Sequence, residues 1–192
     1  MIKSLAERKA RPDATFVEVG VWKGHSASLI GEVVKKQGGH LYCIDHWRGS
    51  VGTELVEEAE KQDIYSVFEH NMKELNLWDC ITPMQLDSLT ASQAFPDKSI
   101  DFLFLDADHR YHQFYDDLIN WTPKMKSGGI VCGHDCEGYY SKMTPAEQER
   151  MSKGLDIDFD GTYHCGVIKG LYDYFHDDYC IADKTHIWFR EL

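Results

Sequence analysis

Apolar residues recur along the chain in two alternating patterns. One is a short, continuous and often β-branched run, which is typical of a strand buried on both faces of a parallel sheet. The other places apolar residues three or four positions apart, as in Ala27, Ile30, Val33 and Val34, which is typical of an amphipathic helix. The first pattern predicts seven strands, at 15–19, 40–45, 81–84, 99–106, 128–135, 179–182 and 185–190.

Helical patterns separate most of these runs, at 2–10, 25–37, 55–75, 88–95, 111–121, 145–152 and 165–175. Strands that alternate with helices favour a parallel sheet with right-handed crossovers. Pro83 lies in the third strand, which favours an edge position because proline cannot donate to a neighbouring strand. The last two strands flank Asp183 and Lys184 and are predicted to form a hairpin.

The segment 136–163 breaks this alternation. It is long, polar and interrupted, and it exceeds the length of a simple connection. We interpret it as an insertion that covers the functional site, with a short helix near 145–152. Apart from this insertion, the 192 residues are predicted to form one domain, 1–192, which is large enough for a substantial core.

The net charge and the cysteines limit the class of partner and the cellular compartment that the sequence predicts. The formal net charge of −12 argues against nucleic acid or an anionic membrane as the main partner, but it leaves a neutral or cationic acceptor open. The six cysteines show no metal-site spacing, and no apolar leader or membrane-spanning run is present. These features predict a cytoplasmic protein. The oligomeric state is not fixed by the sequence, and a homodimer is left open.

A turn bounded by two glycines follows the first predicted strand. The segment from Glu18 through Gly20 to Gly24 leads directly into a helical pattern. Glycines at such a turn let a ligand approach the backbone amides and the helix N-terminus. The spacing E-x-G-x-x-x-G differs from the G-x-G-x-x-G of dinucleotide-binding folds. An ordinary strand-to-helix turn is the alternative interpretation.

Polar residues follow each strand of the predicted parallel sheet. Ligands bind beyond the carboxyl ends of the strands in such sheets. The residues at these ends are Glu18 and Gly20, then Asp45, then 85–88, then 106–109, and finally His134 with Asp135. So many acids and histidines at buried strand ends favour a ligand site over a purely structural role.

Two groups of residues resemble a known family. The E-x-G-x-x-x-G turn resembles motif I of the class I S-adenosylmethionine-dependent methyltransferases. The motif LDADHRY at 105–111, with the later Asp116-Asp117-Leu118 and Gly133-His134-Asp135, resembles the small methyltransferase family labelled class I domain 24. That family is related to catechol, caffeoyl-CoA and macrocin-type O-methyltransferases. The resemblance spans 14–192 and implies an α/β fold: a Rossmann-like three-layer sandwich with a mostly parallel seven-stranded sheet that ends in an antiparallel hairpin.

The resemblance implies S-adenosyl-L-methionine as the cofactor. Its expected contacts are Glu18, Gly20, Gly24, Asp45, Trp47, Asp87, Ser88 and Asp106. Asp45 lies about 20 residues after the glycine turn, where a carboxylate accepts the ribose hydroxyls of an adenosine; capping a turn or helix is its alternative role. Asp87 is expected to accept from the adenine amino group, although Asp87 or Ser88 would also cap the next helix. Trp47 is expected either near the adenine or in the core.

The relatives also place a divalent metal between the fourth and fifth strands. The matching positions here are Asp106, His134 and Asp135. Adjacent parallel strands lie about 4.8 Å apart, so these ends can converge on one ion. Mg²⁺ prefers oxygen ligands, whereas His134 better suits Mn²⁺, Fe²⁺ or Zn²⁺, and the relatives carry no histidine there. Without a metal, Asp135 would cap a loop and His134 would bond to the backbone.

Two residues are predicted to be catalytic, Asp106 and His109. His109 follows Asp106 by three positions, where catechol-type enzymes carry a lysine base. A neutral imidazole can take a proton near pH 7, so His109 is the predicted general base, with helix capping as its alternative role. His164, where the insertion rejoins the fold, is predicted to line the acceptor pocket.

Taken together, these features predict a methyltransferase that uses S-adenosylmethionine to methylate a hydroxyl of a small molecule or sugar. Deprotonation would be assisted by a general base, with a divalent metal (Mg²⁺ or Mn²⁺) as a further candidate cofactor. Two alternatives are a nicotinamide-dependent oxidoreductase and a catalytically silent S-adenosylmethionine-binding module. The absent G-x-G-x-x-G and the predicted terminal hairpin count against the oxidoreductase.

Overall fold

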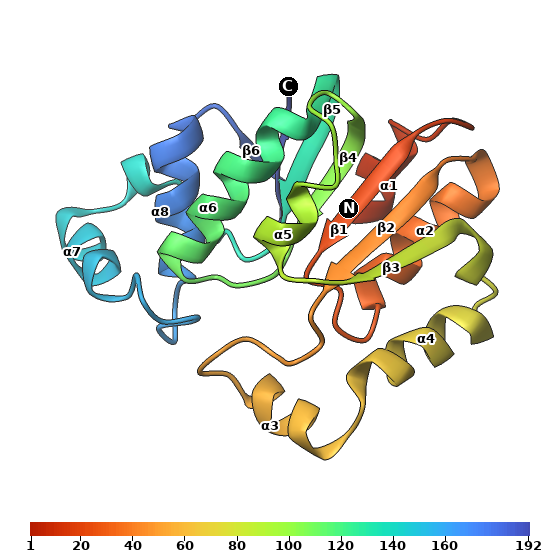
Figure 1. The fold of residues 1–192 in the computed structure, drawn as a ribbon. Helices are drawn as coiled ribbons and strands as arrows, with labels where there is room; N and C mark the ends of the chain where they lie inside the picture. Colours follow the sequence, from red (N-terminus) through yellow and green to blue (C-terminus); the bar gives the residue numbers. More distant parts are fainter.

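The apolar runs of the sequence form one seven-stranded sheet in the computed structural model, which describes residues 1–192 (Figure 1). Its strands are β1 (Thr15–Val19), β2 (His40–Asp45), β3 (Ile81–Gln85), β4 (Ile100–Leu105), β5 (Met125–Gly133), β6 (Cys180–Ile181) and β7 (Trp188–Glu191). Their order is β3-β2-β1-β4-β5-β7-β6. β1 to β5 run parallel, and β7 is antiparallel to both β5 and β6. The predicted fold class is therefore confirmed, including the terminal hairpin and the edge position of β3.

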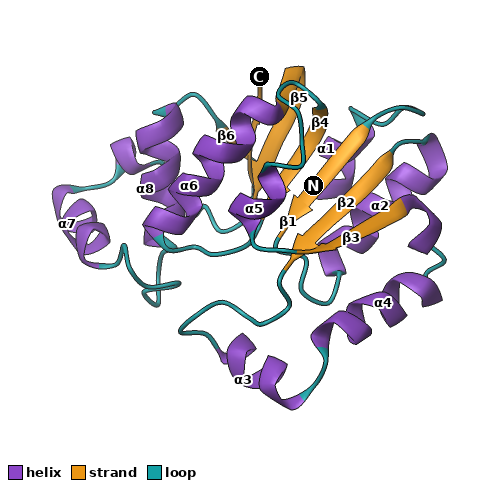
Figure 2. Cartoon of the chain, in the orientation of Figure 1, coloured by secondary structure: helices purple, strands orange, loops and turns teal.

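Helices cover both faces of the sheet and give three layers (Figure 2). One face packs against α1 (Ile2–Glu7), α2 (His25–Gln37) and α4 (Ile64–Glu74), and the other against α5 (Ser88–Ser92), α6 (Tyr111–Trp121) and α8 (Cys165–Phe175). Neighbouring residues of a strand serve opposite layers, as Phe16 and Val17 of β1 do. This explains why the strands are apolar at consecutive positions rather than at alternate ones.

The segment 55–75 is mostly helical, as predicted, but it contains one break. The segment 55–75 forms two helices, α3 (Glu54–Lys61) and α4, because the side chain of Asp63 accepts a hydrogen bond from the Ser66 amide and starts a new helix. α3 contains no buried residue and extends away from the sheet (Figure 1). Smaller differences concern ends: the first helix ends at Glu7, β5 begins at Met125 and β7 begins at Trp188.

The segment 136–163 lies against α6 and α8. It contains α7 (Pro145–Lys153), which starts with a capping box between Thr144 and Glu147. Backbone bonding ties the segment to the start of α6, since the amide of Tyr111 donates to the carbonyl of Leu155 over 2.8 Å. Three short 3₁₀ helices complete the chain: η1 (Trp78–Cys80), η2 (Thr122–Lys124) and η3 (Tyr140–Lys142). No helix has the length and apolar character needed to cross a membrane.

Candidate active site

A cavity of about 420 Å³ opens at the carboxyl ends of β1, β2 and β4. This size suits a cofactor-sized molecule. Five of the predicted cofactor residues line the cavity: Gly20, Asp45, Asp87, Ser88 and Asp106. The other three, Glu18, Gly24 and Trp47, do not line it.

Asp45 holds the glycine turn in place. One carboxylate oxygen accepts from the amides of Val21 and Trp22 over 3.0 and 2.8 Å, and the other accepts from the Trp47 amide over 2.6 Å. A carboxylate offers about four acceptor positions, so three backbone bonds leave room for about one more. Asp45 therefore shapes the turn and keeps limited capacity for a ligand hydroxyl.

Gly20 allows β1 and β4 to meet at the cavity floor. Its φ angle is +88°, which is unfavourable for other residues, and a Cβ atom there would lie 2.1 Å from the carbonyl oxygen of Asp106. Gly24 begins α2 with a similar left-handed conformation, but a Cβ atom there would meet the side chains of Met72 and Phe68. Gly20 thus shapes the cavity itself, whereas Gly24 shapes the packing behind it.

Glu18 lies behind the turn and is fully buried. One carboxyl oxygen accepts from the Ser26 hydroxyl over 2.5 Å, while the other has no hydrogen-bond partner. Burial raises the pKa of Glu18 to about 8, aided by the charges of Asp106 and Asp45 and opposed by the Ser26 bond. Glu18 is therefore mostly protonated at neutral pH.

Asp87 and Ser88 lie at the start of α5 and form part of the cavity wall. Asp87 caps α5 by accepting from the Thr90 amide over 2.9 Å, so the alternative role predicted for it is present. Ser88 donates to the buried carboxyl group of Asp117 and accepts from the Trp121 indole. Burial raises the pKa of Asp117 to about 7, although the Ser88 bond opposes this.

Trp47 belongs to the core, the second of its two predicted positions. It packs against Tyr65 and Phe68, and its indole donates to the carbonyl of Trp22 over 2.8 Å. The ring that reaches the cavity is Trp22, which sequence reasoning missed although it lies inside the glycine turn. His46 also lines the cavity and follows Asp45 directly, so its position after β2 was the available signal.

The cavity lining is strongly acidic. It includes six aspartates, at positions 45, 87, 106, 108, 116 and 117. Its one arginine, Arg110, is paired with Asp108 over 2.6 Å. The helical pattern of α6 gave no signal that Asp116 and Asp117 face the cavity.

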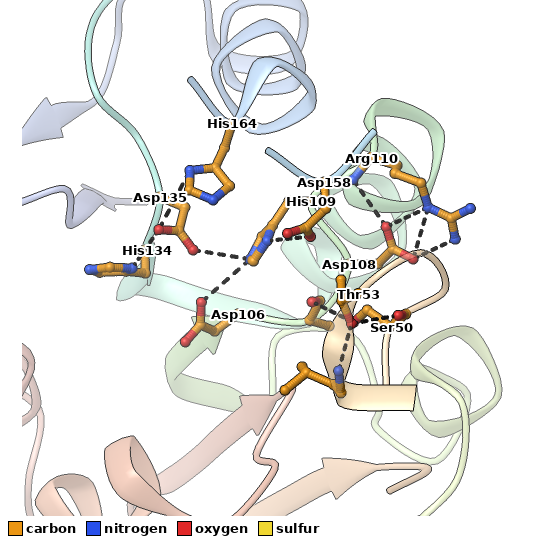
Figure 3. Close-up of polar contacts among 12 residues, drawn as sticks. Ser50, Thr53, Asp106, Asp108, His109, Arg110, His134, Asp135, Asp158 and His164 are labelled. Carbon is orange, nitrogen blue, oxygen red and sulfur yellow. Dashed lines mark hydrogen bonds and ion pairs between the residues drawn. The ribbon is translucent and has the colours of Figure 1, made fainter. Parts of the chain in front are cut away.

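A second cluster of titratable side chains adjoins the cavity (Figure 3). Its centre is His109, whose Nε2 lies 3.2 Å from Asp135 and 3.7 Å from Asp106, and whose Nδ1 lies 2.9 Å from Asp158. Burial alone would lower the pKa of His109, but these carboxylates outweigh it and raise the pKa to about 10. In this arrangement His109 carries a proton at neutral pH, which the predicted general base would first have to lose.

Asp135 brings three histidines together after β5. It adopts a left-handed conformation with φ of +60°, which turns its carboxylate towards the cluster. His134 lies 2.8 Å away, His109 3.2 Å and His164 3.6 Å. Burial would raise the pKa of Asp135, but the three imidazoles lower it. The predicted metal ligands Asp106, His134 and Asp135 have ligand atoms within 4.8 Å of one another.

Asp158 and Glu137 were not predicted, although both belong to the cluster. Glu137 accepts from His164 over 2.6 Å. Both acids come from the segment 136–163, whose sequence shows no periodicity that would place them. Asp106 connects the two parts of the site, because it lines the cavity and also faces His109 (Figure 3).

Comparison with known proteins agrees with this arrangement. A family model described as a methyltransferase domain matches residues 17–136, which is more than half of the chain. Among curated proteins, the chain is 27% identical over 140 residues to the uncharacterized protein R132 of Acanthamoeba polyphaga mimivirus. That match covers 72% of this chain and 59% of the relative, so the chain spans less than two thirds of the relative's length.

Solved structures share the fold at low sequence identity. The O-methyltransferase NovP superposes with a TM-score of 0.64 at 18% identity, covering 99% of this chain and 77% of NovP. The O-methyltransferase from Bacillus cereus in complex with S-adenosylhomocysteine gives a TM-score of 0.59 at 14% identity, covering 100% of this chain and 79% of that chain. The matched family model, the strand order and the glycine turn together place this chain in the methyltransferase domain family of class I S-adenosylmethionine-dependent methyltransferases.

Proposed function

We propose that this chain is a methyltransferase that transfers the methyl group of S-adenosylmethionine to a hydroxyl of a small molecule or sugar. The acidic cavity lining is the observation that carries the proposal. S-adenosylmethionine carries an ammonium and a sulfonium. The ionised aspartates of the lining attract these groups, although Arg110 offsets Asp108 and Asp117 is only partly ionised at neutral pH. A nicotinamide dinucleotide brings a pyrophosphate instead, and the only arginine of the lining is engaged by Asp108.

In this proposal the methyl donor contacts the glycine turn and the residues at the ends of β2 and β3. Gly20 keeps the cavity floor open, and Asp45 retains about one acceptor position for a ribose hydroxyl. Asp87 lines the cavity wall, and its carboxylate is held in position by the bond that caps α5. An adenine amino group would donate a further hydrogen bond to this carboxylate. When bound, the donor supplies an electrophilic methyl group on sulfur.

The cluster around His109 is the proposed acceptor side of the site. Asp106 belongs both to the cavity wall and to this cluster, so a hydroxyl held beside Asp106 would lie between them. In the transfer, the hydroxyl loses its proton, its oxygen bonds to the methyl carbon, and the carbon–sulfur bond breaks to leave a neutral thioether. His109 or bulk water would take the proton, and His109 can do so only after losing the one that its carboxylate neighbours retain.

A divalent metal is a further part of the proposal, and the donor set fits one. His109 Nε2 is buried without a hydrogen-bond partner between two carboxylates, and imidazole and carboxylate groups are common ligands. Asp106, His134 and Asp135 are the ligands expected from the sequence. A metal bound in this cluster would make the acceptor hydroxyl more acidic.

The segment 136–163 is proposed to cover the acceptor. Asp158 bonds to His109, and the neighbouring Phe159 stacks on His164 with ring centroids 4.7 Å apart. Phe159 and Ile157 are apolar yet about half exposed. Together with the net charge of −12, these exposed apolar groups favour a small neutral or cationic acceptor over nucleic acid.

Calorimetry tests the donor half of this proposal. S-adenosylhomocysteine should bind with a stoichiometry of one per chain, and NAD should give no heat at the same concentrations. Heat with NAD and none with S-adenosylhomocysteine would overturn the assignment in favour of an oxidoreductase.

Methyl transfer tests the acceptor half. The protein is incubated with methyl-labelled S-adenosylmethionine and a panel of phenols and sugars, and product is sought by mass spectrometry. Methylation on oxygen that falls strongly in His109→Ala supports the proposal. Tight binding of S-adenosylhomocysteine with no product from any acceptor would favour a silent binding module, and methylation on nitrogen alone would contradict the acceptor class.

A further inference from the structure

Two histidines from distant parts of the chain converge on Asp135. His109 follows β4, and His164 is the residue before α8, where the segment 136–163 rejoins the fold. Their rings meet edge to face with centroids 5.0 Å apart, and both side chains point towards Asp135 (Figure 3). The ligand atoms of His109, Asp135 and His164 lie within 4.8 Å of one another.

A carboxylate holds the Nδ1 atom of each histidine. His109 Nδ1 lies 2.9 Å from Asp158, and His164 Nδ1 lies 2.6 Å from Glu137. An ionised carboxylate only accepts hydrogen bonds, so Nδ1 is the donor in both pairs. This leaves Nε2 of each ring as the atom available to a ligand. Histidines that bind metals are commonly oriented in this way, with the second ring nitrogen bonded to a carboxylate.

The Nε2 atom of His109 is buried and makes no hydrogen bond. It lies 3.2 Å from Asp135 and 3.7 Å from Asp106, and it forms a hydrogen bond with neither carboxylate. A buried polar atom without a partner is costly, and its position between two carboxylates is one that a cation would occupy. The backbone at His109 also packs closely against α8, because a Cβ atom on Gly166 would lie 2.2 Å from the carbonyl oxygen of His109.

We propose that His109, His164 and Asp135 form a metal centre of two imidazoles and one carboxylate, with Asp158 and Glu137 as the carboxylates that orient the two rings. This donor set suits Mn²⁺, Fe²⁺, Co²⁺ or Zn²⁺ better than Mg²⁺, which prefers oxygen ligands. The inference deepens the metal assistance in the proposed function and rests on it for its catalytic meaning. It differs in its ligands, because His109 becomes a ligand and His164 replaces His134. With His109 as a ligand, bulk water rather than His109 takes the proton of the acceptor hydroxyl.

His134 is the weaker candidate on this structure. Its Nδ1 lies 2.8 Å from Oδ1 of Asp135, so the carboxylate nearest its ring is itself a proposed ligand and not a separate orienting group. Its side chain is 43% exposed, compared with 15% for His164 and 17% for His109. The contacts of His134 include no carboxylate besides Asp135 that would orient its ring, unlike Asp158 for His109 and Glu137 for His164.

The centre would also fix the segment 136–163 to the sheet. Glu137 and Asp158 belong to that segment, and His164 ends it, whereas His109 and Asp135 follow β4 and β5. A metal that binds all three ligands would therefore join the cover to the strand ends, and the segment should resist protease better when the metal is bound.

The test is a titration of chelator-treated protein with CoCl₂, followed by visible absorption and calorimetry. We expect one Co²⁺ per chain, with absorption bands in the visible range, and binding of Mg²⁺ at least tenfold weaker. His109→Ala and His164→Ala should each lower the Co²⁺ affinity at least 100-fold. Asp158→Asn should lower it about tenfold, since it removes an orienting carboxylate. His134→Ala removes the competing ligand expected from the sequence, and its Co²⁺ affinity should stay within threefold of the wild type if the ligands proposed here are correct.

Two controls distinguish loss of the metal ligands from misfolding and from failure of the proposed function. Each variant is checked by its urea midpoint and by its affinity for S-adenosylhomocysteine, which is expected in the neighbouring cavity and should change little. His164→Gln replaces His164→Ala if the latter does not fold. Loss of Co²⁺ in His134→Ala but not in His164→Ala would overturn the proposed ligands, and so would tighter binding of Mg²⁺ than Co²⁺. Failure of the wild type to bind S-adenosylhomocysteine would count against the proposed function alone.

Discussion

Replacing Glu18 by glutamine removes a buried carboxyl group from behind the glycine turn while keeping the shape of the side chain. Burial raises the folded-state pKa of Glu18 from 4.5 to about 8. Since the folded-state pKa lies above the unfolded-state value, its contribution to stability is complete below pH 4.5 and is lost as the pH rises to about 8. Each pH unit in this window costs the wild type about 1.36 kcal/mol.

The assay is urea denaturation of the wild type and Glu18→Gln from pH 5 to pH 8. The free energy of unfolding of the variant, relative to the wild type, should rise by about 3 to 4 kcal/mol across this range. Comparing the two proteins cancels the titration of His109 and Asp117, which both contain. A difference that stays constant within about 0.5 kcal/mol would show that Glu18 has the same charge in the folded and unfolded states, and would refute the reasoning.

Three further variants test the turn and the cluster. Gly20→Ala should lower the free energy of unfolding by about 2 to 5 kcal/mol and remove S-adenosylhomocysteine binding, because the new Cβ atom has no room beside Asp106. An unchanged free energy of unfolding by urea denaturation and an unchanged affinity by calorimetry would contradict this. Asp45→Ala leaves three backbone amides without an acceptor, two of them in the glycine turn, and should weaken the binding of S-adenosylhomocysteine at least tenfold by calorimetry. Equal affinity would exclude Asp45 from the donor site. His109→Ala should reduce turnover at least 100-fold with little effect on that affinity, and equal loss of both would indicate misfolding.

Most of the fold could be predicted from the sequence because the strands are buried on both faces. Continuous apolar runs such as 102–105 are typical of strands buried on both faces, and their alternation with helices indicates a parallel sheet. The segment 55–75 was predictable as mostly helical, but its division at Asp63, where a local capping bond starts the second helix, was not. Periodicity reports burial, and it does not report such a break.

The site was predictable where it follows strand ends and unpredictable where it depends on the insertion. Asp45 ends β2, Asp106 directly follows β4 and Asp135 lies two residues after β5, so the topology places them at one edge of the sheet. Asp158 lies 49 residues after His109 in a segment without periodicity, and only the folded backbone brings them together. Together with Asp106 and Asp135, Asp158 raises the pKa of His109, and the sequence could not indicate this contribution of Asp158.

A crystal structure of the protein with S-adenosylhomocysteine tests the central claim most directly. The adenosine should occupy the cavity lined by Gly20, Asp45 and Asp87, with the sulfur directed towards Asp106 and the His109 cluster. Density for the ligand elsewhere, or a cavity that accepts NAD in place of S-adenosylhomocysteine, would contradict the assignment of this cavity to a methyl donor.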